Sequence, residues 1–161
     1  MDIIVEGNAS DFFKPDQISL NINFYTKKDD YNLALSCGTE NVKAFIVNVL
    51  EKLEFKKEDL KTRSFSVSEV TKYDAEKRKH LKDGFAYSQN ANLKFDLDIN
   101  KLSKFMELVS NLDTPPLYRI NFELKNEDKA KSLVIAKAYT KAEEKAKMIA
   151  LAAGKKLKNC I

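Results

Sequence analysis

The alternating segment between Phe85 and Ile99 places the strongest constraint on how this chain can fold. Apolar side chains occupy its odd-numbered positions, with Gln89 as the one interruption, and most even-numbered positions are polar. A period of two is typical of a β-strand with one buried face. Such a segment would span about 50 Å, well above the usual strand of five or six residues. We therefore expect it to pair with the preceding strand in a long β-hairpin.

The same alternation recurs in three shorter segments, which we predict to be strands. They are Ile18–Phe24, Arg63–Tyr73 and Tyr118–Leu124. Short strands are also predicted near the two ends of the sequence, over Ile3–Val5 and Lys156–Ile161. The highly charged segment Asp74–Asp83 is predicted to be an exposed loop at the tip of the hairpin.

Helical periodicity predicts three helices, and the segment from Asn126 to Gly154 is the longest of them. Its apolar residues recur every three or four positions, so they form one stripe along the helix. Asn126 is a natural N-cap, and Gly154 stands where a left-handed C-cap residue is expected. The other two helices are predicted to begin at the capping residues Asp30 and Asn100.

These elements predict an α+β fold in a single domain that covers residues 1–161. Each main strand has one apolar and one polar face, and each helix offers an apolar stripe. The most economical packing has two layers, a mainly antiparallel sheet with three helices on one face and a long protruding β-hairpin. The opposite face of the sheet is rich in Ser and Asn, and it is left to water or to a partner.

Charge and hydropathy exclude several classes of protein. The formal net charge is +4, and the 24 acidic residues are well mixed with the 28 basic ones, so a nucleic-acid partner is disfavoured. The chain has no apolar run long enough to span a membrane. No basic and then apolar leader follows Met1, so we expect a cytoplasmic protein. Export to the periplasm or cell surface is the alternative if a leader has been trimmed.

The sequence offers no group of residues suited to catalysis or to binding a cofactor or metal. His80 is the single histidine and lies among cationic residues, where it is neither a preorganised base nor a metal ligand. Cys37 and Cys160 are the two cysteines, and neither lies in a CxxC pair. We interpret Cys37 as a small buried residue of the first helix. We therefore expect a protein that is not an enzyme and has no cofactor.

Several motifs resemble those of one known family. The run from Asp59 to Val67, DLKTRSFSV, resembles the DI-x-T-x-x-F/Y-S signature of the SIMPL domain family. Other features agree with that family in order and spacing: Val5-Glu6-Gly7, Pro15-Asp16, Tyr73, Gly84-Phe85, and Phe122-Glu123-Leu124 before an Ala-rich helix ending in Ala-x-x-Ala-Gly. Glu54 departs from the pattern because a helix-ending glycine is common there.

The resemblance implies an oligomeric, non-enzymatic protein of unsettled molecular activity. Many members of the family are bacterial and exported, and some are associated with tolerance of oxidative stress. Bacterial relatives can assemble into large hollow oligomers, and the domain takes its name from a eukaryotic signalling adaptor. We accordingly expect a homo-oligomer, with a link to the cell envelope or to the stress response.

We hypothesise self-association through the hairpin between Thr62 and Asn100, because exposed strand edges can pair with another chain. The candidate interaction surface consists of Phe65, Tyr73, Arg78, Phe85 and Tyr87. The alternative is an adaptor that binds a protein partner or a single-stranded nucleic acid through the hairpin tip and the open sheet face. Aromatic residues near the tip could stack on the bases of a single strand, and the basic residues of the tip could pair with its phosphates.

Overall fold

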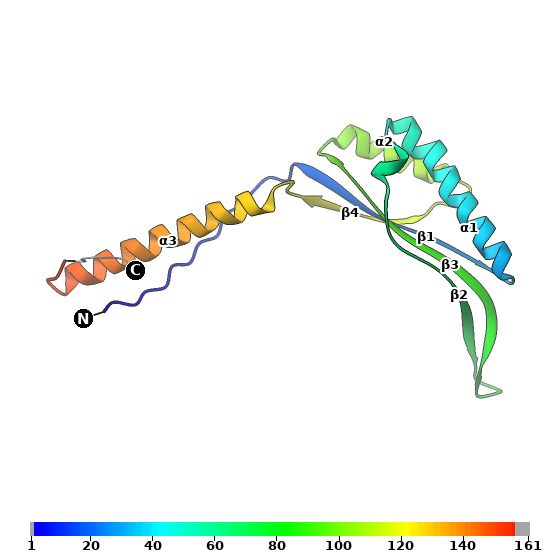
Figure 1. Cartoon of the computed structure of the whole chain (residues 1–161), viewed down its shortest axis with the longest axis horizontal. Helices are drawn as coiled ribbons and strands as arrows, with labels where there is room; N and C mark the ends of the chain where they lie inside the picture. Colours follow the sequence, from blue (N-terminus) through cyan, green and yellow to red (C-terminus); the bar gives the residue numbers. More distant parts are fainter. Residues whose placement is uncertain (1, 157–161) are drawn as a thin grey trace. The chain divides into compact units, whose positions relative to one another are not determined.

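The computed structural model describes residues 2–156 of the 161-residue chain. It contains two units, of which the larger is Asp16–Glu123 and the smaller joins Met1–Pro15 to Leu124–Ile161. Figure 1 labels the elements along the chain. The larger unit holds the sheet, and the smaller holds the longest helix, so the two are described in turn.

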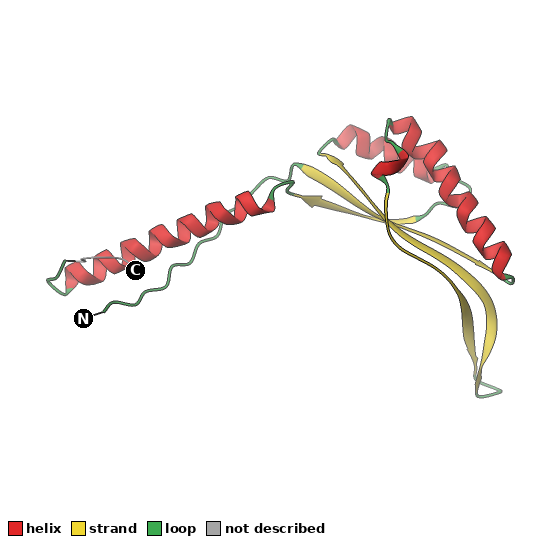
Figure 2. Cartoon of the chain, viewed as in Figure 1, coloured by secondary structure: helices red, strands yellow, loops and turns green. Residues whose placement is uncertain are grey.

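The larger unit contains a four-stranded sheet in which every neighbouring pair is antiparallel. In the order β2-β3-β1-β4, its strands are β2 (Lys61–Asp74), β3 (Lys79–Asp96), β1 (Gln17–Lys28) and β4 (Leu117–Glu123). Two α-helices belong to this unit, α1 (Tyr31–Phe45) and α2 (Ile99–Ser110). Together with α3 (Glu127–Ala152), they confirm the predicted α+β class for the described residues (Figure 2).

One face of the sheet carries the hydrophobic core. The even-numbered apolar residues of β1 and the odd-numbered residues of β3 point to this face, where α1 and α2 lie over the sheet (Figure 1). Phe45 and Phe105 are both fully buried, and their rings meet edge to face with centroids 6.2 Å apart. The core is completed by Ile18, Leu20, Ile22, Phe24, Val49, Leu50, Leu53, Tyr87, Ala91, Leu93, Phe95, Leu102 and Val109.

The first helix begins where the sequence predicts and ends differently from a regular helix. The Oδ1 atom of Asp30 accepts hydrogen bonds from the backbone N–H groups of Asn32 and Leu33, at 2.8 and 3.1 Å. After Phe45 the chain makes a π-helical turn over Ile46–Leu50 and a 3₁₀ turn over Glu51–Leu53. Glu54 then adopts the left-handed conformation with φ of 61°, a region of backbone conformation that favours glycine.

The second helix begins earlier than predicted. Its N-cap is Asp98 rather than Asn100, because the Asp98 Oδ1 atom accepts from the Lys101 backbone N–H at 2.9 Å. The strand before it ends at Asp96, so Ile99 is the first residue of α2. The alternation of β3 therefore continues in sequence beyond the point where the backbone has left the sheet.

Two predictions about strands were wrong. The segment Ile3–Val5 is extended but is not a strand in the described structure. The segment Asp74–Asp83 is mostly strand instead of loop, because β2 continues to Asp74 and β3 resumes at Lys79. Its many charged side chains are compatible with a strand whose two faces are both solvated. A prediction that relies on one apolar face does not identify such a strand.

The smaller unit pairs α3 with the extended segment that precedes β1. Asn126 caps α3 as predicted, since its Oδ1 atom accepts from the Lys129 backbone N–H at 2.9 Å. Gly7 lies so close to α3 that a Cβ atom there would be 2.9 Å from the Ala142 backbone nitrogen. Asp11 forms an ion pair with Lys137. These contacts hold the extended segment along the alanine-rich side of the helix.

Two parts of the predicted architecture stay predictions. Because α3 belongs to the smaller unit, the placement of a third helix on the sheet is untested. The single domain predicted over residues 1–161 is untested as well. The strand predicted over Lys156–Ile161 lies, except for its first residue, outside the described residues.

Candidate interaction surface

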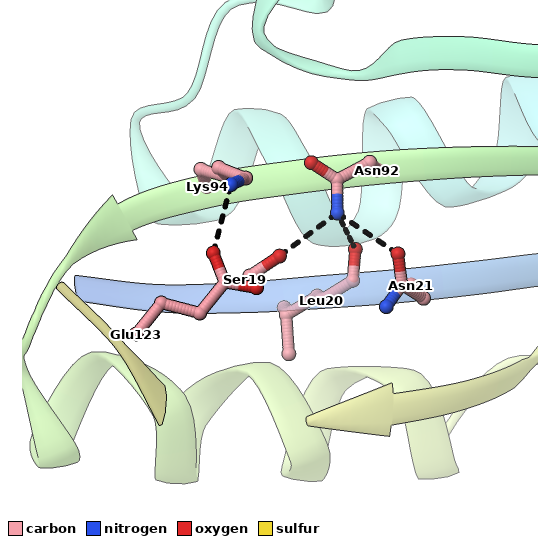
Figure 3. A network of polar contacts seen from close by, with 6 residues as sticks. All are labelled: Ser19, Leu20, Asn21, Asn92, Lys94 and Glu123. Atoms are coloured by element: carbon pink, nitrogen blue, oxygen red, sulfur yellow. Dashed lines mark hydrogen bonds and ion pairs between the residues drawn. The ribbon is translucent and has the colours of Figure 1, made fainter. Parts of the chain in front are cut away.

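The face of the sheet opposite the helices is held together by polar side chains. Asn92 Nδ2 lies 3.0 Å from Ser19 Oγ, 3.1 Å from the Leu20 carbonyl oxygen and 3.0 Å from Asn21 Oδ1 (Figure 3). Ser19 is 1 % exposed and Asn92 is 5 % exposed. A buried amide with all these partners joins β3 firmly to β1, because leaving it unpaired would carry a desolvation penalty.

This network continues across the sheet to both of its outer strands. Asn23 donates to Asn90 at 2.7 Å, and Asn90 donates to Ser64 of β2 at 2.9 Å. Towards β4, Lys94 and Glu123 form an ion pair at 2.7 Å (Figure 3). The polar face that the sequence leaves to water or a partner is therefore a hydrogen-bonded layer that spans all four strands.

The outer edge of β2 offers one regular stretch of backbone. Register shifts interrupt its pairing with β3 between Thr62 and Ser64 and again between Glu69 and Thr71. Between them, Ser64–Glu69 pairs without interruption. We call this stretch the β2 edge. Since β2 is the first strand in the sheet order, the other side of this stretch has no neighbouring strand in the described structure.

The side chains of the β2 edge alternate between the two faces. Phe65 is 54 % exposed, and its ring stands edge to face on Tyr87 with centroids 5.2 Å apart. Val67 is partly buried against the core. The one charged residue of the stretch, Glu69, pairs with Lys82 at 3.2 Å. The β2 edge thus combines free backbone groups with an exposed aromatic ring and little charge.

Beyond Phe85, β3 pairs with β2 alone among the described strands. We call this two-stranded part, Thr71–Gly84, the hairpin tip. Tyr73 and His80 face each other across it, with ring centroids 5.3 Å apart. At the base of the tip, Asp83 pairs with Lys27 of β1. This hydrogen bond lowers the pKa of the Asp83 carboxyl below its usual value.

The turn of the hairpin tip is closed by local hydrogen bonds. Asp74 Oδ1 accepts from the backbone N–H groups of Glu76 and Lys77, each at 3.0 Å. Arg78 follows with a positive φ of 48°, a conformation that few residues other than Gly, Asn and Asp adopt readily. The turn is therefore held by the Asp74 carboxylate at its start and by the left-handed conformation of Arg78 at its end.

The structure separates the five residues of the predicted interaction surface. Phe65 and Tyr73 are both more than half exposed, and Arg78 lies in the turn. Phe85 is half-buried between Tyr31 and the Lys82 ammonium, whose Nζ lies 4.3 Å from the ring centroid.

Tyr87 must be removed from that surface because it is 2 % exposed. Its ring lies where a Cβ atom on Gly38 would collide with it, so Gly38 makes room for it under α1. Burial raises the pKa of the Tyr87 phenol, and the phenol donates a hydrogen bond to Gln89. Its odd-numbered position, shared with the core residues of β3, could have indicated this from the sequence.

Sequence reasoning did not identify the β2 edge itself. The alternation of Ser64, Ser66 and Ser68 with Phe65 and Val67 predicted a strand there, but the two register shifts depend on how β2 meets β3. Small side chains on one face and no charge between Ser64 and Ser68 are the available signal. That pattern is typical of a strand whose edge is open to pairing.

The remaining candidate chemistry is sparse within residues 2–156. No group of three His, Cys, Asp or Glu side chains in this range is placed to hold a metal ion. Cys37 is a free, half-buried thiol of α1. None of the helices in the described part of the chain has the length and hydropathy needed to span a membrane.

Comparison with known families gives one match, and it covers nearly the whole chain. Residues 3–161 match the family model described as SIMPL, protein of unknown function (DUF541). A comparison with curated proteins finds no match. The motifs between Asp59 and Val67, and from Phe122 into α3, lie inside the matched range. The chain therefore belongs to the SIMPL family, whose members are described as proteins of unknown function.

Proposed function

We propose that this chain is a non-enzymatic, self-assembling SIMPL protein, and that its copies associate through the β2 edge. The observation that carries the proposal is the uninterrupted stretch Ser64–Glu69, which pairs with β3 on one side and has no described strand on the other. An unpaired strand edge of this kind is a template for β-strand addition. Its backbone N–H and C=O groups supply the affinity, and its side chains set the register.

A two-fold axis at Ser66 gives the most favourable register for two antiparallel copies. In that register Phe65 of each copy lies directly opposite Val67 of the other, and Ser64 lies opposite Ser68. Aromatic and β-branched residues on opposite strands stabilise antiparallel pairs by roughly 0.2–1 kcal/mol each. No like charges face each other in this arrangement, since Glu69 falls outside the paired centre.

The hairpin tip supports the same proposal. Its two strands pair with each other beyond Phe85, and Tyr73 is 55 % exposed. An isolated two-stranded hairpin is only marginally stable in water. A tip that protrudes from the sheet would gain order if it packed on the adjacent copy, next to the β2 edge. The proposed link to the cell envelope or to oxidative stress rests on the resemblance to the family alone.

The experiment is a measurement of molar mass by light scattering during size-exclusion chromatography over a range of concentrations. We expect the mass to exceed that of one chain and to rise with concentration. A variant that lacks residues 74–83 tests the contribution of the tip, and we expect weaker assembly with an unchanged unfolding transition. A strict monomer at every concentration would contradict the proposal.

A further inference from the structure

A polar groove lies between the end of α1 and the end of α2, away from the β2 edge. Its volume is about 270 Å³. Its apolar lining residues are Ala44, Leu108 and Leu112. The groove is smaller than the pockets that hold drug-sized ligands, which begin at about 300 Å³. It therefore fits a small metabolite better than a peptide or a cofactor.

The first helix and the turns after it contribute polar, largely exposed side chains to the groove. Asn41, Asn48 and Lys52 line it together with Ala44, at spacings of three and four residues that place them on one side of the helix. Asn41 donates to Thr26 Oγ1 at 2.9 Å. The side chains of Asn48 and Lys52 have no partner among the described residues.

The π-helical turn over Ile46–Leu50 is a second, independent feature of this part of the lining. Such turns are rare, and they occur frequently at functional sites. Asn48 belongs to the turn and lines the groove, whereas its neighbours Val49 and Leu50 are fully buried in the core. The turn thus directs Val49 and Leu50 into the core and the Asn48 amide into the groove, while Val47 is half exposed.

A second set of lining residues carries the opposite charge. It is formed by Asn111, Asp113 and Thr114 at the carboxyl end of α2. The last carbonyl groups of a helix carry a partial negative charge, which adds to that of the Asp113 carboxylate. Neither Asp113 nor Thr114 has a side-chain partner in the part of the chain that the structure describes. The groove therefore has a positive side at Lys52 and a negative side at Asp113.

We propose that this groove binds a small zwitterion with a polar side chain, of the chemical class of the free polar amino acids. The carboxylate of the ligand pairs with Lys52, and its ammonium group pairs with Asp113 and the carbonyl end of α2. The Asn48 amide donates to or accepts from the side chain of the ligand. Charge-assisted hydrogen bonds at both ends favour a zwitterion over ligands with a single charge.

The test uses the full chain labelled with ¹⁵N and L-glutamine as the probe. We expect saturable changes in amide chemical shift with glutamine up to about 20 mM, well above the millimolar dissociation constants of weak ligands. The changes should be confined to residues 41–52 and 108–114. Acetate and ethylammonium, which each carry one of the two charges, should bind at least about tenfold more weakly.

Three variants make the test specific to the groove. Lys52→Met and Asp113→Asn should each weaken glutamine binding by at least about tenfold, whereas Lys104→Met should not change it. Lys104 is an exposed residue of α2 that does not line the groove. All three side chains are exposed, so the amide spectrum should confirm a native fold. Absence of saturation, equal binding of acetate or ethylammonium, or wild-type affinity in both groove variants would overturn the proposal.

Discussion

The two outer strands of the sheet differ in what they offer to another chain. The strand β4 has 7 residues and pairs with the first part of β1, and the sequence enters α3 at Glu127, shortly after β4 ends at Glu123. Natural proteins often protect an outer strand by keeping it short. The strand β2 has 14 residues and presents Ser64–Glu69 without interruption. Length alone therefore favours β2 as the edge that takes a second copy.

Charge separates the two strands in the same direction. Arg119 and Glu123 place charge at two of the seven positions of β4, and because Glu123 pairs with Lys94 of β3, the difference from the β2 edge lies at Arg119. On the β2 edge, Glu69 is the one charged side chain, and Lys82 of β3 neutralises it. Charged side chains on an outer strand oppose pairing with another chain. We therefore expect the length of β2, more than the position of either strand in the sheet, to decide which edge associates.

The largest expected effect concerns the packing beneath β4. Phe105 is fully buried, and its ring meets Tyr118 of β4 at a centroid distance of 5.4 Å. We expect Phe105→Ala to lower the free energy of unfolding by about 3–5 kcal/mol, because it leaves a cavity in the core. The half-exposed Phe65 provides the matched change in β2, and Phe65→Ala should cost less than about 1.5 kcal/mol. Urea denaturation measures the free energy of unfolding of both variants. Equal losses in the two variants would contradict the difference between the packing beneath β4 and the β2 edge.

A smaller loss of stability is expected at the polar face between the two outer strands. Asn92→Ala removes the amide that holds Ser19 Oγ, the Leu20 carbonyl and Asn21 Oδ1. We expect the free energy of unfolding to fall by about 1–3 kcal/mol. Asn121 of β4 lies on the same face and is half-buried, so Asn121→Ala is the control, with a change within about 0.5 kcal/mol. Similar values for the two variants would show that the network is not structural.

Association should respond to a charge on β2 and not to the same charge on β4. We expect Phe65→Lys to weaken self-association by at least about tenfold, or about 1.4 kcal/mol, because an edge lysine must be desolvated and repels its symmetry mate. Leu117 is 73 % exposed on β4, and Leu117→Lys should leave association unchanged. Sedimentation velocity over a concentration series distinguishes them. A larger effect at Leu117 would assign the interface to β4.

The sequence predicted the central part of this fold well because period and burial agree there. The alternation of Ile18, Leu20 and Ile22 predicted β1, and the side-chain chemistry of Asp30 and Asn126 predicted two helix starts. In each case a local interaction selects the structure. The same holds in the candidate site, where the alternation around Phe65 predicted a strand.

The errors come from places where distant segments decide the structure. The hairpin tip was predicted to be a loop because both of its faces are charged, yet pairing of Thr71 with Lys82 continues the ladder. Tyr87 was placed on the surface although its odd-numbered position is shared with the core residues of β3, and Gly38, which makes room for its ring, is far away in the sequence. The register shifts that bound the β2 edge likewise depend on β3, so no local pattern could locate them.

The smallest expected effect concerns the base of the hairpin tip. The hydrogen bond from Lys27 holds the pKa of the Asp83 carboxyl below 3.8 in the folded protein. A depressed folded pKa stabilises the protein above the unfolded pKa, and this contribution is lost as the pH falls through the folded value. We expect Lys27→Met to raise the pKa of Asp83 towards 3.8 without changing the fold. Carboxyl ¹³C shifts titrated with pH measure it, and an unchanged pKa would show that the contact does not form in solution.

Hydrogen exchange of the backbone amides tests the central claim most directly, because it reports on both outer strands in one experiment. If copies associate through the β2 edge, the protection of amides in Ser64–Glu69 should increase with protein concentration. The amides of β4 should exchange at the same rate at every concentration. Concentration-dependent protection in β4, or none in β2 while the molar mass rises, would contradict the account.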